Sequence, residues 1–430
     1  MSKRDLKFIY KAVLWTITPF FLLIAYSAAL IVRRNVVPEK PRIVWGSEPI
    51  INNSYWSKGM INAGYSSETF TTDYFSINKR DDWDRILSEQ YSWAPPPIKP
   101  LVAFVDSLFR YDVYIISFKG FFIGKWPFSY LQAHILKLAG KKIVVIPYGG
   151  DSYVYRRIRS MGTLHGLMIS YPMASIDQEK IGRDVDYWCS NADAIVPWFM
   201  GPDGFGRWDV LMPSPLTINL EYWTATTKKN DADGISGTVI ITHAPNHRGF
   251  KGTEFILEVV GNLQAEGLKI ELRLLEKISN IEVCHTLQKE TDILIDQIIC
   301  TGYAMNALEG LASGLPVISN LEDDAYTMPM RRWSYLGECP IVSASPETLE
   351  NVLRKLVTSP ELRQQLGSAG RAYAEKYHGL DSGKYLFENI IGYVYGRCDS
   401  LINLYHPLLG EYPNRSPKID HPLVNSRIIN

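Results

Sequence analysis

Short apolar runs rich in β-branched residues alternate with helix-like segments along most of this chain, and this alternation limits its fold more than any other feature. A strand followed by a helix and another strand builds a parallel sheet with helical crossovers. The predicted strands are 42–45, 112–117, 142–147 and 193–198 in one set, and 238–243, 269–276, 292–296 and 315–320 in a second. The polar stretch 226–237 separates the two sets, so we expect two α/β domains in tandem.

The same pattern gives the domain boundaries. A chain of 430 residues has room for about two domains. We place the first domain at residues 41–215 and the second at 216–378. A C-terminal helix at 379–397 and a tail at 398–430, rich in proline and asparagine, follow them.

A stretch near the N-terminus is apolar enough to enter a membrane. Residues 12–32 hold no charged side chain and are long enough, as a helix, to cross a hydrocarbon core of about 30 Å. Basic residues flank the stretch on both sides, so an excess of positive charge does not set its orientation. We expect a transmembrane anchor over residues 8–34. A cleaved signal peptide that ends near "YSAAL" is the alternative.

Composition excludes several classes of protein. Lys plus Arg equals Asp plus Glu at 45 each, so no whole-chain positive charge argues for a nucleic-acid partner. The five cysteines are scattered without zinc or redox spacing, which predicts reduced thiols. The chain has no HExxH motif, P-loop or GxGxxG fingerprint. We therefore expect neither a metal nor a bound cofactor.

The segment "HAPNHRGFKGTEF" (243–255) lies between a predicted strand and a predicted helix. The first N–H groups of a helix are unpaired and favour anions, and open α/β sheets bind ligands at the carboxyl ends of their strands. Arg248 and Lys251 can hold phosphate there, while Gly249 and Gly252 would let the backbone approach it. The segment predicts a phosphate site. The alternative is a solvated loop with two surface cations.

A second segment, "TGYAMNALEGLASGLPVIS" (301–319), carries a family resemblance. Gly302, Tyr303 and Met305 take the glycine-aromatic-apolar positions of a pattern found in retaining GT-B glycosyltransferases of family 4, and Glu309 takes its second glutamate. The closing "GLPVIS" and the Arg-Lys-Gly segment above are also similar to that family. The resemblance implies two Rossmann-like domains (the GT-B fold) behind the transmembrane helix.

The resemblance also implies roles for these residues. Glu309 would bind the ribose of a nucleotide-sugar donor, and Arg248 and Lys251 would hold its diphosphate and stabilise the leaving group. Backbone N–H groups from Gly302 through Tyr303 to Ala304 would support the sugar or the phosphate. The family retains the anomeric configuration and needs no divalent metal.

Two departures from the family pattern affect the chemistry. Thr301 stands where the family has its first glutamate, which addresses the donor sugar. In the loop "YGGDSY" (148–153), Tyr148 and Asp151 stand where many relatives use histidine. Asp151 is therefore the candidate for orienting or deprotonating the acceptor hydroxyl. An Asx turn that stabilises the loop is the alternative.

Four more residues follow predicted strands at the edge where α/β sheets bind ligands. Asp296 would lie near the donor, with helix N-capping as the alternative. Gly46 and Ser47, after the first strand, would line the acceptor side of the cleft. His243 would touch the ligand, whereas a loop histidine more often makes local hydrogen bonds.

We therefore expect a membrane-anchored glycosyltransferase that moves a sugar from a nucleotide-sugar to a glycan or lipid-linked acceptor. Because nucleotide-sugars are made in the cytosol, we place its catalytic part on the cytoplasmic side of the membrane, with a lumenal placement left open. The alternative is a non-catalytic GT-B scaffold or sugar-binding subunit, and a nucleotide-sugar epimerase is a third reading. The aromatic segment 118–128 would either dip into lipid headgroups or pack inside the first domain.

Overall fold

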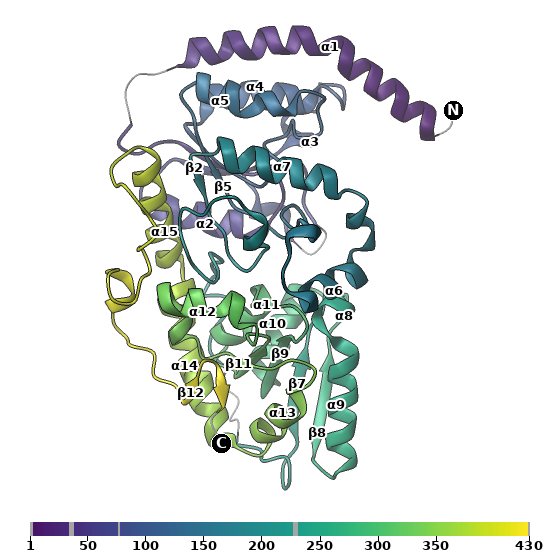
Figure 1. Ribbon diagram of the computed structural model, residues 1–430, viewed down its shortest axis with the longest axis vertical. Helices are drawn as coiled ribbons and strands as arrows, with labels where there is room; N and C mark the ends of the chain where they lie inside the picture. Colours follow the sequence, from purple (N-terminus) through teal and green to yellow (C-terminus); the bar gives the residue numbers. More distant parts are fainter. Residues whose placement is uncertain (1–2, 34–37, 76–77, 227–230, 429–430) are drawn as a thin grey trace.

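The computed structural model describes residues 3–33, 38–75, 78–226 and 231–428, with side chains from residue 14 onward. Each half of the chain forms one parallel sheet with packed helices, and the two halves are stacked along the long axis of the molecule (Figure 1). The predicted fold class, two tandem Rossmann-like α/β domains, is therefore confirmed.

The first sheet is built from six parallel strands. They are β1 (Ile43–Trp45), β2 (Ser67–Thr71), β3 (Arg85–Ile86), β4 (Val113–Ile116), β5 (Lys142–Val145) and β6 (Ala194–Ile195). Their order in space is β3-β2-β1-β4-β5-β6, the doubly wound order whose direction of growth switches between β1 and β4. In β1, Ile43 and Trp45 enter one apolar cluster and Val44 enters another, so both faces of the sheet are covered.

The helices of the first domain connect these strands. They are α2 (Ile51–Asn62), α3 (Leu87–Gln90), α4 (Lys99–Arg110), α5 (Gln132–Leu138), α6 (Met161–Ser170) and α7 (Gln178–Asn191). The aromatic segment 118–128 packs inside the domain, since Phe118, Phe121, Ile123 and Trp126 are buried.

The second sheet has five parallel strands. They are β7 (Val239–His243), β8 (Ile270–Leu274), β9 (Ile293–Gln297), β10 (Val317–Ser319) and β11 (Val342–Ser343). Their order is β11-β10-β9-β7-β8, which switches between β7 and β9. The helices here are α8 (Arg248–Lys251), α9 (Thr253–Ala265), α10 (Asn280–Lys289), α11 (Met305–Ala312), α12 (Asp324–Trp333), α13 (Leu349–Val357) and α14 (Pro360–His378). A switch point in each sheet predicts a ligand between the domains.

The C-terminal helix α15 (Leu380–Val394) returns to the first domain, where it packs on α2. The ring of Phe387 lies edge-on to Trp45 at 4.6 Å between centroids and contacts Trp56 at 5.4 Å. Asn52 of α2 accepts a hydrogen bond from the backbone N–H of Thr217 at 2.6 Å. The segment that follows the second sheet therefore joins the two domains.

Residues 398–428 are packed against the molecule, whereas the sequence predicted a tail. Leu401, Tyr405 and Tyr412 are buried among tyrosines from the second domain. The chain ends in a small antiparallel pair, β12 (Leu423–Val424) and β13 (Arg427–Ile428), beside which Ser343 donates a backbone hydrogen bond to Ser426.

Helix α1 (Lys3–Val32) lies across the outer end of the first domain, over α4 and α5 (Figure 1). Its stretch Leu14–Val32 is long and apolar enough to cross a membrane, and 28% of that stretch is buried against the first domain. Residue 34 of the predicted anchor lies outside the described residues, as do the side chains of residues 8–13.

Candidate functional site

A cavity of about 490 Å³ lies between the two domains, at the carboxyl edges of both sheets. The first domain supplies the loops after β5 and β6 together with the end of α6 and the residues that follow it. The second domain supplies the loops after β7 and β9. The cavity therefore lies where the sheet topology predicts a ligand, and residues from both halves of the chain line it.

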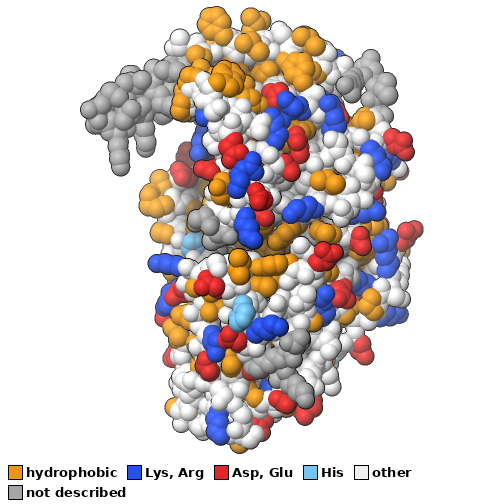
Figure 2. Space-filling view, turned by 180° about the vertical axis from the view of Figure 1, so that it is seen from behind, with side chains coloured by type: hydrophobic (Ala, Val, Ile, Leu, Met, Phe, Trp, Pro, Cys, Tyr) orange, Lys and Arg blue, Asp and Glu red, His pale blue; other side chains and the backbone are white. Residues whose placement is uncertain are grey.

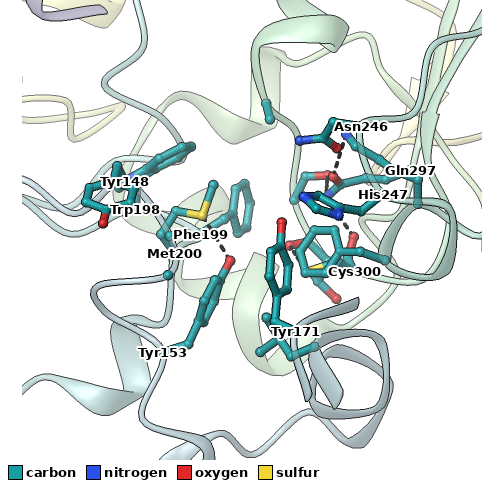
Figure 3. A pocket seen from close by; sticks show the side chains of 18 of the residues that line it. Tyr148, Tyr153, Tyr171, Trp198, Phe199, Met200, Asn246, His247, Gln297 and Cys300 are labelled. Carbon is teal, nitrogen blue, oxygen red and sulfur yellow. Dashed lines mark hydrogen bonds between the residues drawn. The ribbon is translucent and has the colours of Figure 1, made fainter. Parts of the chain in front are cut away.

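The wall from the first domain is aromatic (Figure 3). Tyr148 follows β5, and Trp198, Phe199 and Met200 follow β6. Tyr153 stands on the same side and donates its hydroxyl hydrogen bond to the sulfur of Met200 at 2.9 Å. Flat aromatic faces of this kind suit the apolar face of a sugar ring or a base.

The opposite wall is polar and centres on Lys251. Its ammonium group bonds Asp296 Oδ1 at 2.5 Å and Gln297 Oε1 at 3.0 Å, and all three side chains are nearly inaccessible to solvent. Asp296 Oδ2 accepts the N–H of Ala304 at 3.3 Å. Gln297 donates to the carbonyl oxygens of Cys300 and Gly302, so this polar group fixes the turn that forms the cavity floor.

That turn leads directly into α11. Ala304 lines the cavity and is the N-cap residue of the helix, and it makes no side-chain cap hydrogen bond. The N-cap side chain therefore makes no bond to the first N–H groups of α11, and a helix N-terminus at the edge of the cavity favours a negative charge. Two doubly wound domains enclose a cleft between the carboxyl edges of their sheets. The chain has the GT-B fold.

Several solved structures resemble this chain over most of its length. An alpha-glucosyltransferase in complex with UDP and DNA matches at 10% identity and a TM-score of 0.45, covering 82% of this chain and 100% of that one. The UDP-GlcNAc 2-epimerase from Neisseria meningitidis, bound to UDP-GlcNAc, matches at 13% identity and a TM-score of 0.39, covering 81% of this chain and 98% of that one. The wall teichoic acid polymerase TagF matches at 11% identity and a TM-score of 0.39, covering 92% of this chain and 99% of that one.

At these identities and TM-scores the similarities carry nothing about the activity of this chain. The fold assignment rests on the two sheets and the cavity between them. No protein-family model matches the sequence, and no curated protein matches it.

Arg248 does not line the cavity. It stands in α8 with its guanidinium bonded to both oxygens of Glu276 at 2.8 Å each and to Glu254 at 2.8 Å. These ion pairs are partly exposed, so each is weak and a ligand could compete for the arginine. In the structure as it stands, Lys251 alone of the two predicted cations reaches the cavity.

The glycines around α8 serve packing, Gly249 between the domains and Gly252 within the second domain, which differs from the ligand approach expected from the sequence. A Cβ on Gly249 would lie 2.3 Å from Ile169 of α6, and a Cβ on Gly252 would lie 2.5 Å from Ile298. Gly252 also has φ of +79° at the end of α8. Helix α6 can therefore rest on α8 because Gly249 carries no side chain, and Gly252 leaves room for Ile298.

His243 ends β7 and does not touch the cavity. Its ring nitrogens bond the carbonyl oxygen of Ile295 and the hydroxyl of Thr253, each at 2.9 Å, and the side chain is fully buried. Burial lowers the pKa of His243 to about 4, so the ring is neutral near pH 7. The prediction that His243 contacts a ligand is not supported by its place in the structure. It ties β7 to β9 and to the start of α9.

Glu309 lies in the second turn of α11, beyond the residues that line the cavity. Its carboxyl oxygens accept hydrogen bonds from Asn280 at 3.3 Å and Asn306 at 3.2 Å. Burial raises the pKa of Glu309 to about 7, and the two amide donors oppose that rise. Burial is the main cause that raises the pKa of Tyr55 in α2, and the charge of Glu309 adds to it.

Asp151 is buried within the loop that follows β5. Its carboxylate accepts the backbone N–H groups of Tyr148 at 3.0 Å, Gly149 at 3.1 Å and Phe118 at 3.0 Å. Burial raises the pKa of Asp151 to about 6 against the opposing effect of these donors. The geometry matches the loop-stabilising alternative, and Asp151 is not among the residues that line the cavity.

Gly46 and Ser47 follow the first strand, as predicted. Gly46 lines a separate small pocket, and Ser47 is buried in the interior of the first domain. A Cβ on Gly46 would lie 2.0 Å from the carbonyl oxygen of Phe70, so no side chain fits there. The hydroxyl of Ser47 accepts the N–H of Phe122 at 3.2 Å. Both residues shape the first-domain loops, and neither lines the large cavity.

Gly302 and Tyr303 lie on the cavity floor. Gly302 has φ of +119°, and a Cβ there would lie 2.7 Å from Phe199 of the first domain. Thr301, which replaces the family's first glutamate, also lines the cavity. The hydroxyl of Tyr303 points into the core, where it bonds Tyr373 at 3.0 Å. The turn therefore presents backbone and small side chains to a ligand.

The sequence did not single out most of the cavity wall. Tyr171, Trp198, Met200 and Cys300 line it without belonging to a motif, and Tyr153 lines it as the last residue of the loop "YGGDSY", in which it was not a candidate (Figure 3). Most of these residues lie in loops that follow strands of the two sheets, so the topological rule that selected Gly46 could also have selected several of them. Among the described residues, no cluster of three or more His, Cys, Asp or Glu side chains could hold a metal ion.

Proposed function

We propose that this protein transfers a sugar from a nucleotide-sugar donor to a glycan or lipid-linked acceptor, at a membrane and on its cytoplasmic side. The reaction would retain the anomeric configuration and use no divalent metal or other cofactor. The observation that carries the proposal is the cavity itself, with an anion-favouring turn in one wall and aromatic rings in the other.

The donor diphosphate would lie at the start of α11. An ammonium group has three N–H donors, and Lys251 gives two of them to Asp296 and Gln297. Its third donor and the N–H groups of the first turn of α11 would meet the diphosphate oxygens. Negative charge grows on the leaving diphosphate during transfer, so preorganised donors at this place stabilise the transition state more than the ground state.

The nucleoside and the acceptor would take opposite sides of the diphosphate. Glu309, held by Asn280 and Asn306, would accept hydrogen bonds from the ribose hydroxyls as the donor extends along α11. The acceptor sugar would stack against the aromatic wall near Tyr153 and Trp198.

A non-catalytic sugar-binding subunit is the second candidate, and specific contacts favour it. Arg248 is committed to Glu276 and Glu254, and both oxygens of Asp151 are occupied by backbone donors. Thr301 carries no carboxylate toward the donor sugar. A binding subunit would keep the aromatic wall and the turn without needing a base.

Calorimetric titration of the full-length protein in detergent with UDP, GDP, ADP and CMP tests the donor site. We expect one nucleotide to bind, and Glu309→Gln to weaken it about tenfold, or about 1.4 kcal/mol. Glu258→Gln, on the exposed side of α9, is the matched control and should bind like the wild type. Absence of binding by all four nucleotides to folded protein would overturn the donor assignment.

An assay for sugar transfer distinguishes the glycosyltransferase from the sugar-binding subunit. The protein would be incubated with the radiolabelled sugar form of the nucleotide that binds and with a membrane lipid extract or oligosaccharides. A labelled product supports the transferase. Nucleotide binding without hydrolysis or transfer, over all acceptors tried, would favour the sugar-binding subunit.

A further inference from the structure

We propose that α1 lies flat along the surface of a membrane with anionic lipids, as part of a docking face of the first domain, and does not cross the bilayer. The docking face consists of the outward side of α1, the outward side of α4 and the lysines and arginines beside them. The inference concerns attachment only and does not rest on the proposed reaction.

The inner side of α1 is fitted to the first domain. Phe21 packs on Trp126 at 4.7 Å and on Phe104 at 6.3 Å between ring centroids. Ala25 and Ala29 are fully buried, which lets the helix approach α4 and α5 closely. A helix that crossed a bilayer away from the domain would lose these contacts and expose the apolar side chains beneath it.

The outer side of α1 is apolar as well. Its exposed large apolar side chains are Trp15, Phe20, Leu23, Ile24, Leu30 and Ile31, each more than half exposed. Their spacing of three, four and seven residues places most of them on one side of the helix. Figure 2 shows apolar side chains gathered at this end of the molecule. A large apolar face of this kind marks an interaction site with a protein or a membrane.

The apolar surface continues from α1 onto α4. A groove of about 420 Å³ between the two helices has an almost wholly apolar lining that includes Ile17, Phe20, Val105 and Phe109. Asp106 is the one acidic lining residue, and it pairs with Arg85 and Arg110. The face is therefore broader than a single helix, which a flat bilayer surface matches better than a narrow peptide.

Basic residues border this face. A second hollow of about 380 Å³ contains Lys125, Lys180 and Arg183, of which Lys180 pairs with Asp184. Its lining includes Trp126, the residue that packs on Phe21 of α1. Lysine and arginine beside an apolar helix face attract anionic headgroups, which are the partner that fits both the charge and the apolar surface.

The first experiment determines on which side of the membrane each end of the protein lies. Single cysteines at Ser2→Cys and Lys289→Cys, each in a Cys398→Ser background, would be expressed in bacteria and exposed to an impermeant maleimide before and after lysis. The other four cysteines are buried. We expect both sites to react on the same side. Reaction of one site before lysis and of the other only afterwards would show a spanning helix and overturn the proposal.

The second experiment tests the basic border with vesicles. Lys125→Ala/Arg183→Ala should bind vesicles with 30% phosphatidylglycerol at least about tenfold more weakly, with unchanged binding to phosphatidylcholine vesicles. Lys289→Ala/Lys355→Ala, exposed on the second domain, should bind both like the wild type. Equal loss in the two variants, or no loss in either, would overturn the headgroup contact. An unchanged midpoint of urea denaturation in both variants would show that neither result reflects misfolding.

Discussion

Asp151 shows at the residue scale how burial decides between two roles that the sequence leaves open. A general base needs a free lone pair directed at the substrate. Three backbone N–H groups within 3.1 Å instead share the two oxygens of this carboxylate. The carboxylate holds Tyr148 and Gly149 at the cavity wall, so Asp151 affects a ligand indirectly, by positioning this loop.

Asp151→Asn tests this role. The amide would turn an N–H₂ group toward a backbone N–H, either that of Phe118 or those of Tyr148 and Gly149, and leave a buried donor unpaired. We expect a loss of about 1–3 kcal/mol in the free energy of unfolding, measured by urea denaturation. Lost transfer activity at unchanged stability would instead identify Asp151 as the base.

Glu309 gives a prediction in pH. Its pKa is about 7 in the folded protein, against 4.5 for the ordinary side chain. Between these values the folded state holds a proton that the unfolded state releases, so this group's contribution to stability falls as pH rises through that window and is constant above it. Glu309→Gln stays neutral, and urea midpoints from pH 5 to 8 should therefore fall less steeply in the variant.

At pH 8 the free energy of unfolding of Glu309→Gln should exceed that of the wild type by at most about 3 kcal/mol. Glu258→Gln, exposed on α9, should follow the wild-type slope. If the urea midpoints of Glu309→Gln and the wild type changed with pH in parallel, the carboxyl of Glu309 would have an ordinary pKa in the folded protein.

At the element scale, His243 connects β7, β9 and the start of α9. Its pKa near 4 lies below the 6.5 of an ordinary histidine, so above pH 6.5 the folded and unfolded states are both neutral and its full contribution is present. As pH falls from 6.5 toward 4, the unfolded state takes up a proton that the folded state does not, and stability is lost.

His243→Ala should lower the free energy of unfolding at pH 7 by about 2–3 kcal/mol, because it leaves the Ile295 carbonyl and Thr253 unpaired. The difference in free energy of unfolding between the wild type and the variant should shrink as pH falls. The wild type loses about 3 kcal/mol of stability when the unfolded state protonates His243, and the variant has no such residue to protonate. His285→Ala, on the exposed side of α10, is the control. A deficit that stays constant from pH 7 to 4.5 would contradict the buried, neutral ring.

At the scale of the whole molecule, α15 determines whether the two domains unfold together. It follows the second sheet in sequence and packs on α2 of the first domain through Phe387. Removing that ring should cost about 3–5 kcal/mol and weaken the connection between the domains.

We expect calorimetry of the wild type to give one unfolding transition and Phe387→Ala to separate it into two. Phe255→Ala removes a ring of the same size from the partly exposed side of α9 and should leave a single transition. Two transitions already present in the wild type would show that α15 does not couple the domains.

The sequence predicted the main strands because their signal is local. The runs at β1, β4, β5, β7, β9 and β10 are apolar over several consecutive residues, as strands covered on both faces must be. The edge strand β8 (Ile270–Leu274) instead alternates apolar and charged residues. The polar β2 (Ser67–Thr71) and the two-residue β3 and β11 carry no such signal, and only pairing with neighbours makes them strands. The tail after residue 397 is ordered by tyrosines that contact it from other elements.

The sequence by itself determined two parallel α/β domains, an apolar N-terminal helix and a loop-to-helix turn at residues 301–305, since all three depend on local residue patterns. Only the tertiary structure decided which side chains reach the cavity. Arg248 pairs with Glu276, His243 bonds Ile295, and aromatic rings from separate loops form the facing wall. Side-chain charges and rings act over a few ångströms, and residues far apart in sequence become neighbours at that distance only after the sheets have formed.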